Sequence, residues 1–429
     1  MRSVRSGRRR SSAPTCRPSL GSREASVTVT DIPDVPDMAR MRRETGQKLR
    51  ASMARHGVDV LVLIGNSKVS YATGVSWPLG DSGLAHVDRP VAVILADDPE
   101  PHVFLPFREG AVPGAELAAG HLHDPVYLEY DEGTELFAGQ LAELVPAGAV
   151  IAVDELTGAM RRIQHRLFPG GLVDAGRIIS EAKATKTADE LACMRRALRI
   201  TEEAMADVER ALAPGVRQVD LSGRFVRRAF ELGATANVLD PIWQVMPPSR
   251  AEGVWTIHGD LALPLLTTER ELARGDVLWV DVSVSWGGYC SDFGRTWVVG
   301  QDPSPRQRAQ FRRWTEIVDA VHAVTRAGAT GAELTKAAIE AHGDGTRPWV
   351  KHFYLGHGLG VDAAEMPFVG TDLGDQFDQS VVLEAGNILV LEPIVWEDGT
   401  GGYRAEEVML ITDDGYIMLS DYPFTPYGD

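Results

Sequence analysis

Amphipathic stretches alternate with nearly continuous apolar runs over the first part of the chain. Helical spacing of apolar residues predicts a helix over 38–56, and the apolar run at 58–65 predicts a strand buried on both faces. A further helix is expected over 134–144, with Thr134 as its N-cap. Shorter apolar runs predict additional strands at 91–95, 102–107, 150–153 and 172–173. This alternation predicts an α/β domain over residues 38–178.

The second part of the chain contains a repeated helical pattern. Thr187 and Glu190 have the spacing of a capping box, and the apolar residues that follow keep helical spacing. Placing Gly215 on Gly328 aligns this helix and the next one with a second helix pair later in the chain. The repeat predicts a domain of two similar halves over residues 185–425.

Composition places the chain among globular proteins and reveals a basic N-terminus. Hydrophobic residues make up 44% and charged residues 24%, which excludes a wholly disordered or fibrous chain. The formal charge is −17 although the first residues are rich in Arg, so the rest is more acidic still. Such acidity argues against nucleic acid as a partner. Residues 1–37 are interpreted as a disordered tail or an over-long start, with initiation near Met38; a transit peptide or twin-arginine signal is the alternative.

Cysteine usage and the lengths of the apolar runs bear on where the protein is located. The 3 Cys are far apart in the sequence and never within CxxC spacing, which predicts a reducing, cytoplasmic compartment. No apolar run approaches the roughly 20 residues that a membrane span needs, so no membrane association is expected.

The stretch 275–300 predicts a β-hairpin that carries two aspartates. With the turn centred between Trp286 and Gly287, Asp281 is expected directly opposite Asp292 on one face of the ribbon. Like charges opposite one another destabilise a strand pair unless a cation lies between them. The pair is therefore a candidate metal site, and a register error that turns one Asp to solvent is the alternative.

A second predicted hairpin repeats this arrangement with glutamates. Centring the turn on Gly399 pairs Glu392 with Glu406, and each interrupts an apolar strand. A slip of one residue would bring Glu407 to the same face in place of Glu406. Between the hairpins, His357 lies between two glycines that allow close backbone approach, and it would add a nitrogen ligand. Four carboxylates and one imidazole suit two divalent ions such as Mn, Co, Fe or Zn, a combination used for hydrolysis.

In this order the five residues resemble the ligands of the creatinase and methionine aminopeptidase superfamily, the pita-bread metallopeptidases. The resemblance covers roughly residues 38–425 and implies a creatinase/prolidase N-terminal domain followed by a pita-bread domain with an internal pseudo-twofold repeat. It implies that Asp281 chelates one metal ion, and that Asp292 and Glu406 bridge two. By the same resemblance His357 and Glu392 bind the other ion, Glu392 is the base for the attacking water, and the protein is a homodimer.

Several positions depart from the family pattern. Family peptidases have an HExP segment, in which Ala364 here stands at the position of the histidine. An alanine cannot shuttle a proton, and His352 or Asp362 are the possible substitutes. Ser283 and Gly294 also replace a usual Gly and Thr. His258 resembles the substrate-contacting histidine that precedes the aspartates.

Two further residues are candidates for substrate binding. Trp255, with Trp243 and Trp286, flanks the site segments and would form an aromatic pocket, although core packing is the alternative for any one Trp. Arg404 would grip a substrate carboxylate or pair with nearby acids.

These features lead to three functional hypotheses. The first is a dinuclear-metal hydrolase of the Xaa-Pro dipeptidase or aminopeptidase type, acting on a small molecule or short peptide. The second is a non-peptidase member of the superfamily, similar to creatinase, ectoine hydrolase or dimethylsulfoniopropionate lyase. The third is a metal-free binding protein, which is disfavoured because unneeded buried carboxylates are costly.

Overall fold

A computed structural model of the chain describes residues 32–74, 89–105, 117–246, 267–349, 351–397 and 401–428. The predicted tail, apart from its last residues, lies outside these ranges, as do His258 and Trp255. Within the ranges no helix is both long enough and apolar enough to cross a bilayer.

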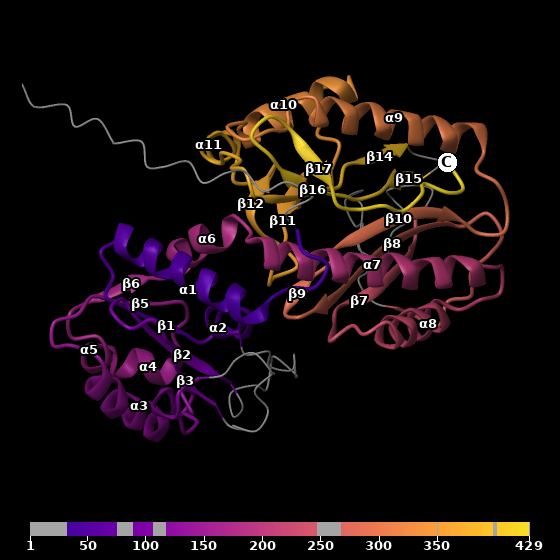
Figure 1. Cartoon of the computed structure of the whole chain (residues 1–429). Helices are drawn as coiled ribbons and strands as arrows, with labels where there is room; N and C mark the ends of the chain where they lie inside the picture. Colours follow the sequence, from indigo (N-terminus) through magenta and orange to yellow (C-terminus); the bar gives the residue numbers. More distant parts are fainter. Residues whose placement is uncertain are drawn as a thin grey trace, which may run out of the picture.

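The N-terminal part is built around one mixed sheet (Figure 1). Its described strands have the order β4-β3-β2-β1-β5-β6, and β1 pairs antiparallel to β2 and parallel to β5. The strands are β1 (Val60–Leu63), β2 (Val91–Leu95), β3 (His102–Phe104), β4 (Leu122–His123), β5 (Ile151–Val153) and β6 (Leu172–Asp174). The helical segments are α1 (Met38–Arg55), α2 (Asn66–Thr73), η3 (Ala119–His121), α3 (Asp131–Leu144), α4 (Gly158–Arg162), α5 (Gln164–Leu167) and α6 (Gly176–Ala184).

The start of α3 differs from the prediction. The helix begins at Asp131 with Tyr130 as its N-cap, so Thr134 lies inside the first turn and is buried. Its hydroxyl donates to the carbonyl oxygens of Leu128 (3.1 Å) and Tyr130 (2.9 Å) and caps nothing. Gly133 explains the earlier start, because a Cβ there would lie 2.2 Å from the carbonyl oxygen of Tyr127. The glycine allows the helix to pack against the preceding loop.

The C-terminal part places its strands between two helix pairs, α7/α8 and α9/α10 (Figure 1). These helices are α7 (Ala188–Ala211), α8 (Gln218–Glu231), α9 (Pro305–His322) and α10 (Gly331–His342), with a short α11 (Asp375–Ser380). The strands of the first half are β7 (Ala236–Val245), β8 (Val277–Trp286), β9 (Tyr289–Cys290) and β10 (Phe293–Val298). Those of the second half are β11 (Gly356–Gly358), β12 (Glu365–Val369), β13 (Ile388–Leu391), β14 (Ile394–Glu397), β15 (Gly401–Arg404), β16 (Glu407–Ile411) and β17 (Tyr416–Met418).

The two halves repeat the same order of helix, helix and strands, as the sequence pattern predicts. The capping box of Thr187 and Glu190 is present at the start of α7, and α10 has one at Thr330. The first half forms the sheet β10-β8-β7, with β9 on β8, and the second forms β12-β11-β13-β16-β17 with the pair β14-β15 beside it.

Basic residues of the N-terminal part pair with buried acids of the C-terminal part. Arg40 and Lys48 of α1 form ion pairs with Asp189 (2.7 Å) and Glu190 (3.2 Å) in the first turn of α7. Lys183 of α6 pairs with Glu365 at the start of β12 at 2.8 Å. All three acids are buried. Because these charges compensate one another, the two parts hold each other in place.

Candidate metal centre

The first hairpin has a two-residue turn, and its register differs from the prediction. Gly287 and Gly288 both have positive φ (60° and 85°), as the central pair of a type I′ turn requires, and Trp286 cannot take that conformation readily. The turn is therefore centred one residue later than predicted, and Asp281 lies opposite Gly294 instead of Asp292. Because the pairing moves by two residues, the two aspartates still share one face of the ribbon as diagonal neighbours.

The second hairpin has the predicted register. Leu391 pairs with Glu407 and Ile394 pairs with Arg404, which sets Glu392 opposite Glu406 between these two pairs. Glu407 turns to the other side, where its Oε1 lies 3.0 Å from Nη2 of Arg295. The structure therefore places Glu406 in the site, and the one-residue slip does not occur.

Hydrogen bonds to backbone carbonyl oxygens join the two hairpins and bring their carboxylates together. The amide of Glu406 donates to the carbonyl oxygen of Gly294 at 3.1 Å, and Nη1 of Arg295 donates to the carbonyl oxygen of Glu406 at 2.6 Å. A Cβ on Gly294 would lie 2.5 Å from the Val280 carbonyl oxygen and 3.1 Å from Oε1 of Glu406. Gly294 is thus the point at which the hairpins touch. One oxygen each from Asp281, Asp292 and Glu406 lies within 4.8 Å of the other two.

His357 enters the group from β11. A Cβ on Gly356 would lie 2.5 Å from the Val390 carbonyl oxygen, and one on Gly358 would lie 2.3 Å from the Met366 carbonyl oxygen, so both flanking glycines are needed. Nδ1 of His357 donates to the carbonyl oxygen of Gly358 at 2.8 Å. The other ring nitrogen, Nε2, faces the acids.

The imidazole faces one carboxylate from each hairpin. Nε2 of His357 lies 3.2 Å from Oδ2 of Asp292 and 3.3 Å from Oε1 of Glu392. Burial would lower the pKa of His357, but these two carboxylates together raise it well above its ordinary value. In the absence of metal, Nε2 of His357 therefore holds a proton, and the positive ring lies between the two carboxylates.

Arg404 lies among the acids of the site. Its guanidinium contacts Oδ2 of Asp281 (3.4 Å), Oε1 of Glu406 (2.6 Å) and Oε2 of Glu392. Its Cζ lies 4.1 Å from the centre of the Trp279 ring, and Arg404 is buried. Of the two predicted roles, pairing with nearby acids is the one observed here; contact with a substrate carboxylate stays a prediction.

Burial changes the acidity of two carboxyl groups. Desolvation raises the pKa of Asp281 to about 7, with Arg404 opposing the shift and the charges of Asp292 and Glu392 adding to it. Desolvation likewise raises the pKa of Glu406 well above its ordinary value, against the attraction of Arg404. A single guanidinium and a single imidazolium do not compensate four buried carboxylates.

The donor atoms fit divalent metal ions. Among the described residues, Oδ1 of Asp281 and Oε2 of Glu406 are buried and have no hydrogen-bond partner. Buried carboxylate oxygens without partners are costly unless a cation binds them. The group also has the mixed oxygen and nitrogen donors that borderline divalent ions prefer.

The other predicted residues have varied positions. His258 and Trp255 lie outside the described residues, so their predicted roles in catalysis and substrate binding stay predictions. Trp243 is a core residue whose Nε1 donates to Ser222, and Trp286 packs at the edge of the core near the turn. His352 is exposed and pairs with Asp372, and Asp362 pairs with Lys183.

Sequence reasoning missed Trp279 and the lysines behind the HExP-like segment. Trp279 precedes Asp281 by two residues on β8, so strand alternation alone would have placed it on the same face. Lys183 and Lys186 hold Glu365 from both sides, at 2.8 and 2.9 Å. No sequence signal connects these lysines with a residue so far along the chain.

A pita-bread fold with a carboxylate and imidazole centre defines a class of metallopeptidases, and the sequence comparisons agree. The chain belongs to metallopeptidase family M24, whose pattern matches residues 192–413, more than half of the chain. The creatinase/prolidase N-terminal domain matches residues 46–183. By this membership the chain is a metal-dependent hydrolase.

Particular relatives are similar over most of their length. An uncharacterized peptidase, YqhT, of Bacillus subtilis is 24% identical over 390 residues, covering 88% of this chain and 98% of the relative. The probable dipeptidase PepE of Mycobacterium tuberculosis H37Rv is 26% identical over 348 residues, covering 78% and 84%. Among solved structures, the prolidase of Pyrococcus horikoshii has a TM-score of 0.69 at 20% identity, covering 89% of this chain and 99% of that one. The X-Pro aminopeptidase of Thermotoga maritima has a TM-score of 0.70 at 17% identity, covering 88% and 98%.

Proposed function

We propose that the chain is an Xaa-Pro peptidase of the dipeptidase or aminopeptidase type, which cleaves a C–N bond in a short peptide-like substrate with two divalent ions. The observation that carries this proposal is the buried group of four carboxylates and one imidazole described above. Asp281 would hold one ion, and Asp292 and Glu406 would bridge the two. His357 and Glu392 would hold the other. Mn, Co, Fe and Zn all suit these donors.

The chain's own groups would supply proton transfer and orientation. Divalent ions bound at this centre would polarise a carbonyl and lower the pKa of a water molecule. Glu392 is the candidate base: Arg404 binds its Oε2, and its Oε1 faces Nε2 of His357 at 3.3 Å, inside the centre where the attacking water would lose its proton. Arg404 holds three of the carboxylates and rests on Trp279, so it would keep them oriented. His258 is the further catalytic candidate.

The substrate class rests on the relatives. One curated relative, from Pyrococcus furiosus, is named Xaa-Pro dipeptidase and is 26% identical over 246 residues. The solved structures named prolidase and X-Pro aminopeptidase share the fold. A short-peptide substrate containing proline is therefore our first choice.

One observation favours a second candidate function. Ala364 is exposed just before β12, at the position where the family pattern has the HExP histidine. Without a proton donor there, the centre would suit a non-peptidase substrate similar to those of creatinase or ectoine hydrolase, or a lyase reaction as with dimethylsulfoniopropionate.

The test is metal-dependent hydrolysis by the purified full chain. We would load the protein with Mn²⁺ or Co²⁺, measure bound metal, and compare cleavage of Xaa-Pro dipeptides with matched Xaa-Ala dipeptides. Asp292→Asn should lose metal and activity, whereas Asp302→Asn, at an exposed position, should lose neither. Fewer than about one bound ion per chain after this loading would overturn both enzyme functions. A metal-loaded protein that cleaves no proline peptide would favour the second candidate.

A further inference from the structure

A second group of metal-ligating side chains lies in the N-terminal sheet, separate from the carboxylate centre. Asp98, His102 and His121 each offer one ligand atom, and these atoms all lie within 4.8 Å of one another. Asp98 is in the turn between β2 and β3, His102 begins β3, and His121 ends η3 directly before β4. Three neighbouring segments therefore converge on one point at the edge of the sheet.

The spacing of these atoms suits a single small ion. Oδ2 of Asp98 lies 3.2 Å from Nε2 of His121 and 3.8 Å from Nε2 of His102. Zinc–nitrogen bonds of about 2.0–2.1 Å in a tetrahedral site put neighbouring ligand atoms about 3.3 Å apart. Only small side-chain movements would therefore be needed to bind an ion.

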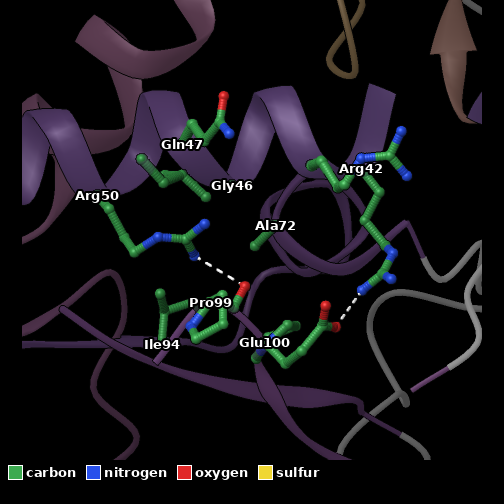
Figure 2. A pocket seen from close by; sticks show the side chains of 11 residues that line it. Arg42, Gly46, Gln47, Arg50, Ala72, Ile94, Pro99 and Glu100 are labelled. Atoms are coloured by element: carbon green, nitrogen blue, oxygen red, sulfur yellow. Dashed lines mark hydrogen bonds and ion pairs between the residues drawn. The ribbon is translucent and has the colours of Figure 1, made fainter. Parts of the chain in front are cut away.

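The turn that carries Asp98 is held in place. Oδ1 of Asp98 accepts a hydrogen bond from the amide of Glu100 at 2.9 Å, so Oδ2 is the oxygen left for the histidines. Figure 2 shows the same turn fastened to α1: Nη1 of Arg50 donates to the carbonyl oxygen of Pro99 at 3.1 Å, and Arg42 forms an ion pair with Glu100. The carboxylate is thereby oriented before any ion binds.

The ring of His102 is oriented by a second histidine. Its Nδ1 lies 3.0 Å from Nε2 of His123, whose ring stacks on Phe104 with centroids 4.5 Å apart. When Nδ1 donates to His123, the lone pair of Nε2 is directed at Asp98 and His121.

His121 contributes a further observation. Its Nδ1 is buried and has no hydrogen-bond partner among the described residues, while its Nε2 contacts Asp98. An exposed histidine would have water at both ring nitrogens. Since solvent does not reach Nδ1 of His121, packing holds the ring with Nε2 toward Asp98.

We propose that Asp98, His102 and His121 bind one borderline divalent ion such as Zn²⁺, with water completing its coordination. The ion ties β4, the edge strand of the sheet, to the turn before β3. Its role is to stabilise the N-terminal domain, and it takes no part in the hydrolytic reaction. Two imidazoles and one carboxylate form a donor set that binds Zn²⁺ well and Mg²⁺ or Ca²⁺ poorly.

The test compares zinc content and thermal unfolding of full-length variants. After exposure to Zn²⁺ and removal of free metal, the wild type and His165→Ala should hold about one ion more per chain than His121→Ala. His165 is an exposed histidine of the same domain and serves as the matched control. Zn²⁺ added to chelator-treated protein should raise the melting temperature less for His121→Ala than for the control.

A second variant covers the case in which His121→Ala does not fold. Asp98→Asn keeps the volume of the side chain and should show the same loss of one zinc ion. Equal zinc content in the wild type and in whichever variant folds would overturn the proposal. Cleavage by the Mn²⁺-loaded enzyme should be the same for the folded variants, which separates this site from the carboxylate centre.

Discussion

Glu406 lies against Gly294, with its amide bonded to the carbonyl oxygen of the glycine and its carboxylate 3.1 Å from the place a Cβ would occupy. This contact joins two hairpins that are far apart in the sequence. It also explains why a residue with a side chain, the usual Thr of the family pattern, would not be accommodated here without rearrangement.

Gly294→Ala should therefore destabilise the protein and disturb the metal centre. Its Cβ would meet the Val280 carbonyl oxygen at 2.5 Å, and overpacking of this kind costs about 1–3 kcal/mol. Gly223→Ala in α8 is the matched control, since no atom apart from its chain neighbours and the nearby helix backbone lies within 4 Å of the added Cβ. This variant should raise the free energy of unfolding by about 0.5–1 kcal/mol. Denaturant unfolding measures both. Equal free energies of unfolding for the two variants would contradict the close contact.

Adjacent glutamates should respond differently to the same substitution. Glu406→Gln removes a proposed bridging ligand. Metal affinity should therefore fall by more than about 100-fold, which exceeds the loss typical when a residue that only hydrogen-bonds to a ligand is changed. Glu407→Gln should keep the metal, because Glu407 contacts Arg295 and Ser420 instead. Metal titration calorimetry compares them. Loss of metal in Glu407→Gln alone would mean that the hairpin register is wrong.

Metal binding should depend on pH through the neutral range. The pKa of Asp281 is about 7 and that of Glu406 is raised by burial, so the metal-free centre holds protons that an incoming ion must displace. Affinity should therefore rise as the pH rises from about 6 to 8, with protons released. Calorimetry in buffers of different protonation enthalpy detects this release. An affinity independent of pH would show that the carboxylates are already ionised.

The same shift has a consequence for the metal-free protein. The pKa of Asp281 in the fold lies above its ordinary value of 3.8, so the folded state binds more protons than the unfolded state between these values. The free energy of unfolding of the metal-free protein should therefore fall as the pH rises from about 4 to 7. Asp281→Asn should weaken this dependence, whereas the exposed Asp302→Asn should leave it unchanged.

Ala364→His should increase cleavage of proline peptides. The position is exposed just before β12, so the larger side chain fits, and a positioned general acid or base contributes about 10²–10⁴-fold. We expect kcat/KM for an Xaa-Pro dipeptide to rise at least about tenfold. Leu373→His, at another exposed position, is the control. If neither the wild type nor Ala364→His cleaves a proline peptide while metal is bound, the peptidase proposal should be abandoned.

Sequence patterns predicted the elements whose signals are local. The strand at Val91–Leu95 has the predicted bounds, and α7 has the predicted capping box. The start of α3 was wrong because Thr134 has the chemistry of a cap, while the contact between Gly133 and Tyr127 that sets the start is not visible in a capping pattern. A capping propensity belongs to a single residue, whereas packing depends on the neighbours that the residue contacts in the fold.

The site shows a similar division. Alternation along strands grouped Asp281 with Asp292 correctly even though the register was wrong, since a shift of two residues keeps each side chain on its face. The position of Arg404 among three acids, and of Gly294 between two hairpins, depends on how separate hairpins meet. No spacing along the chain contains that information.

The charges shared between the two parts limit how the chain can be divided. Arg40, Lys48 and Lys183 belong to the N-terminal part, yet they compensate Asp189, Glu190 and Glu365, which are buried in the other. A fragment that began near residue 185 would expose the start of its first helix, leave Asp189 and Glu190 without these cations, and leave Glu365 with Lys186 as its remaining lysine partner. The family patterns match two separate regions, residues 46–183 and 192–413. For protein engineering, the C-terminal part should nevertheless be expressed together with the N-terminal part as one chain.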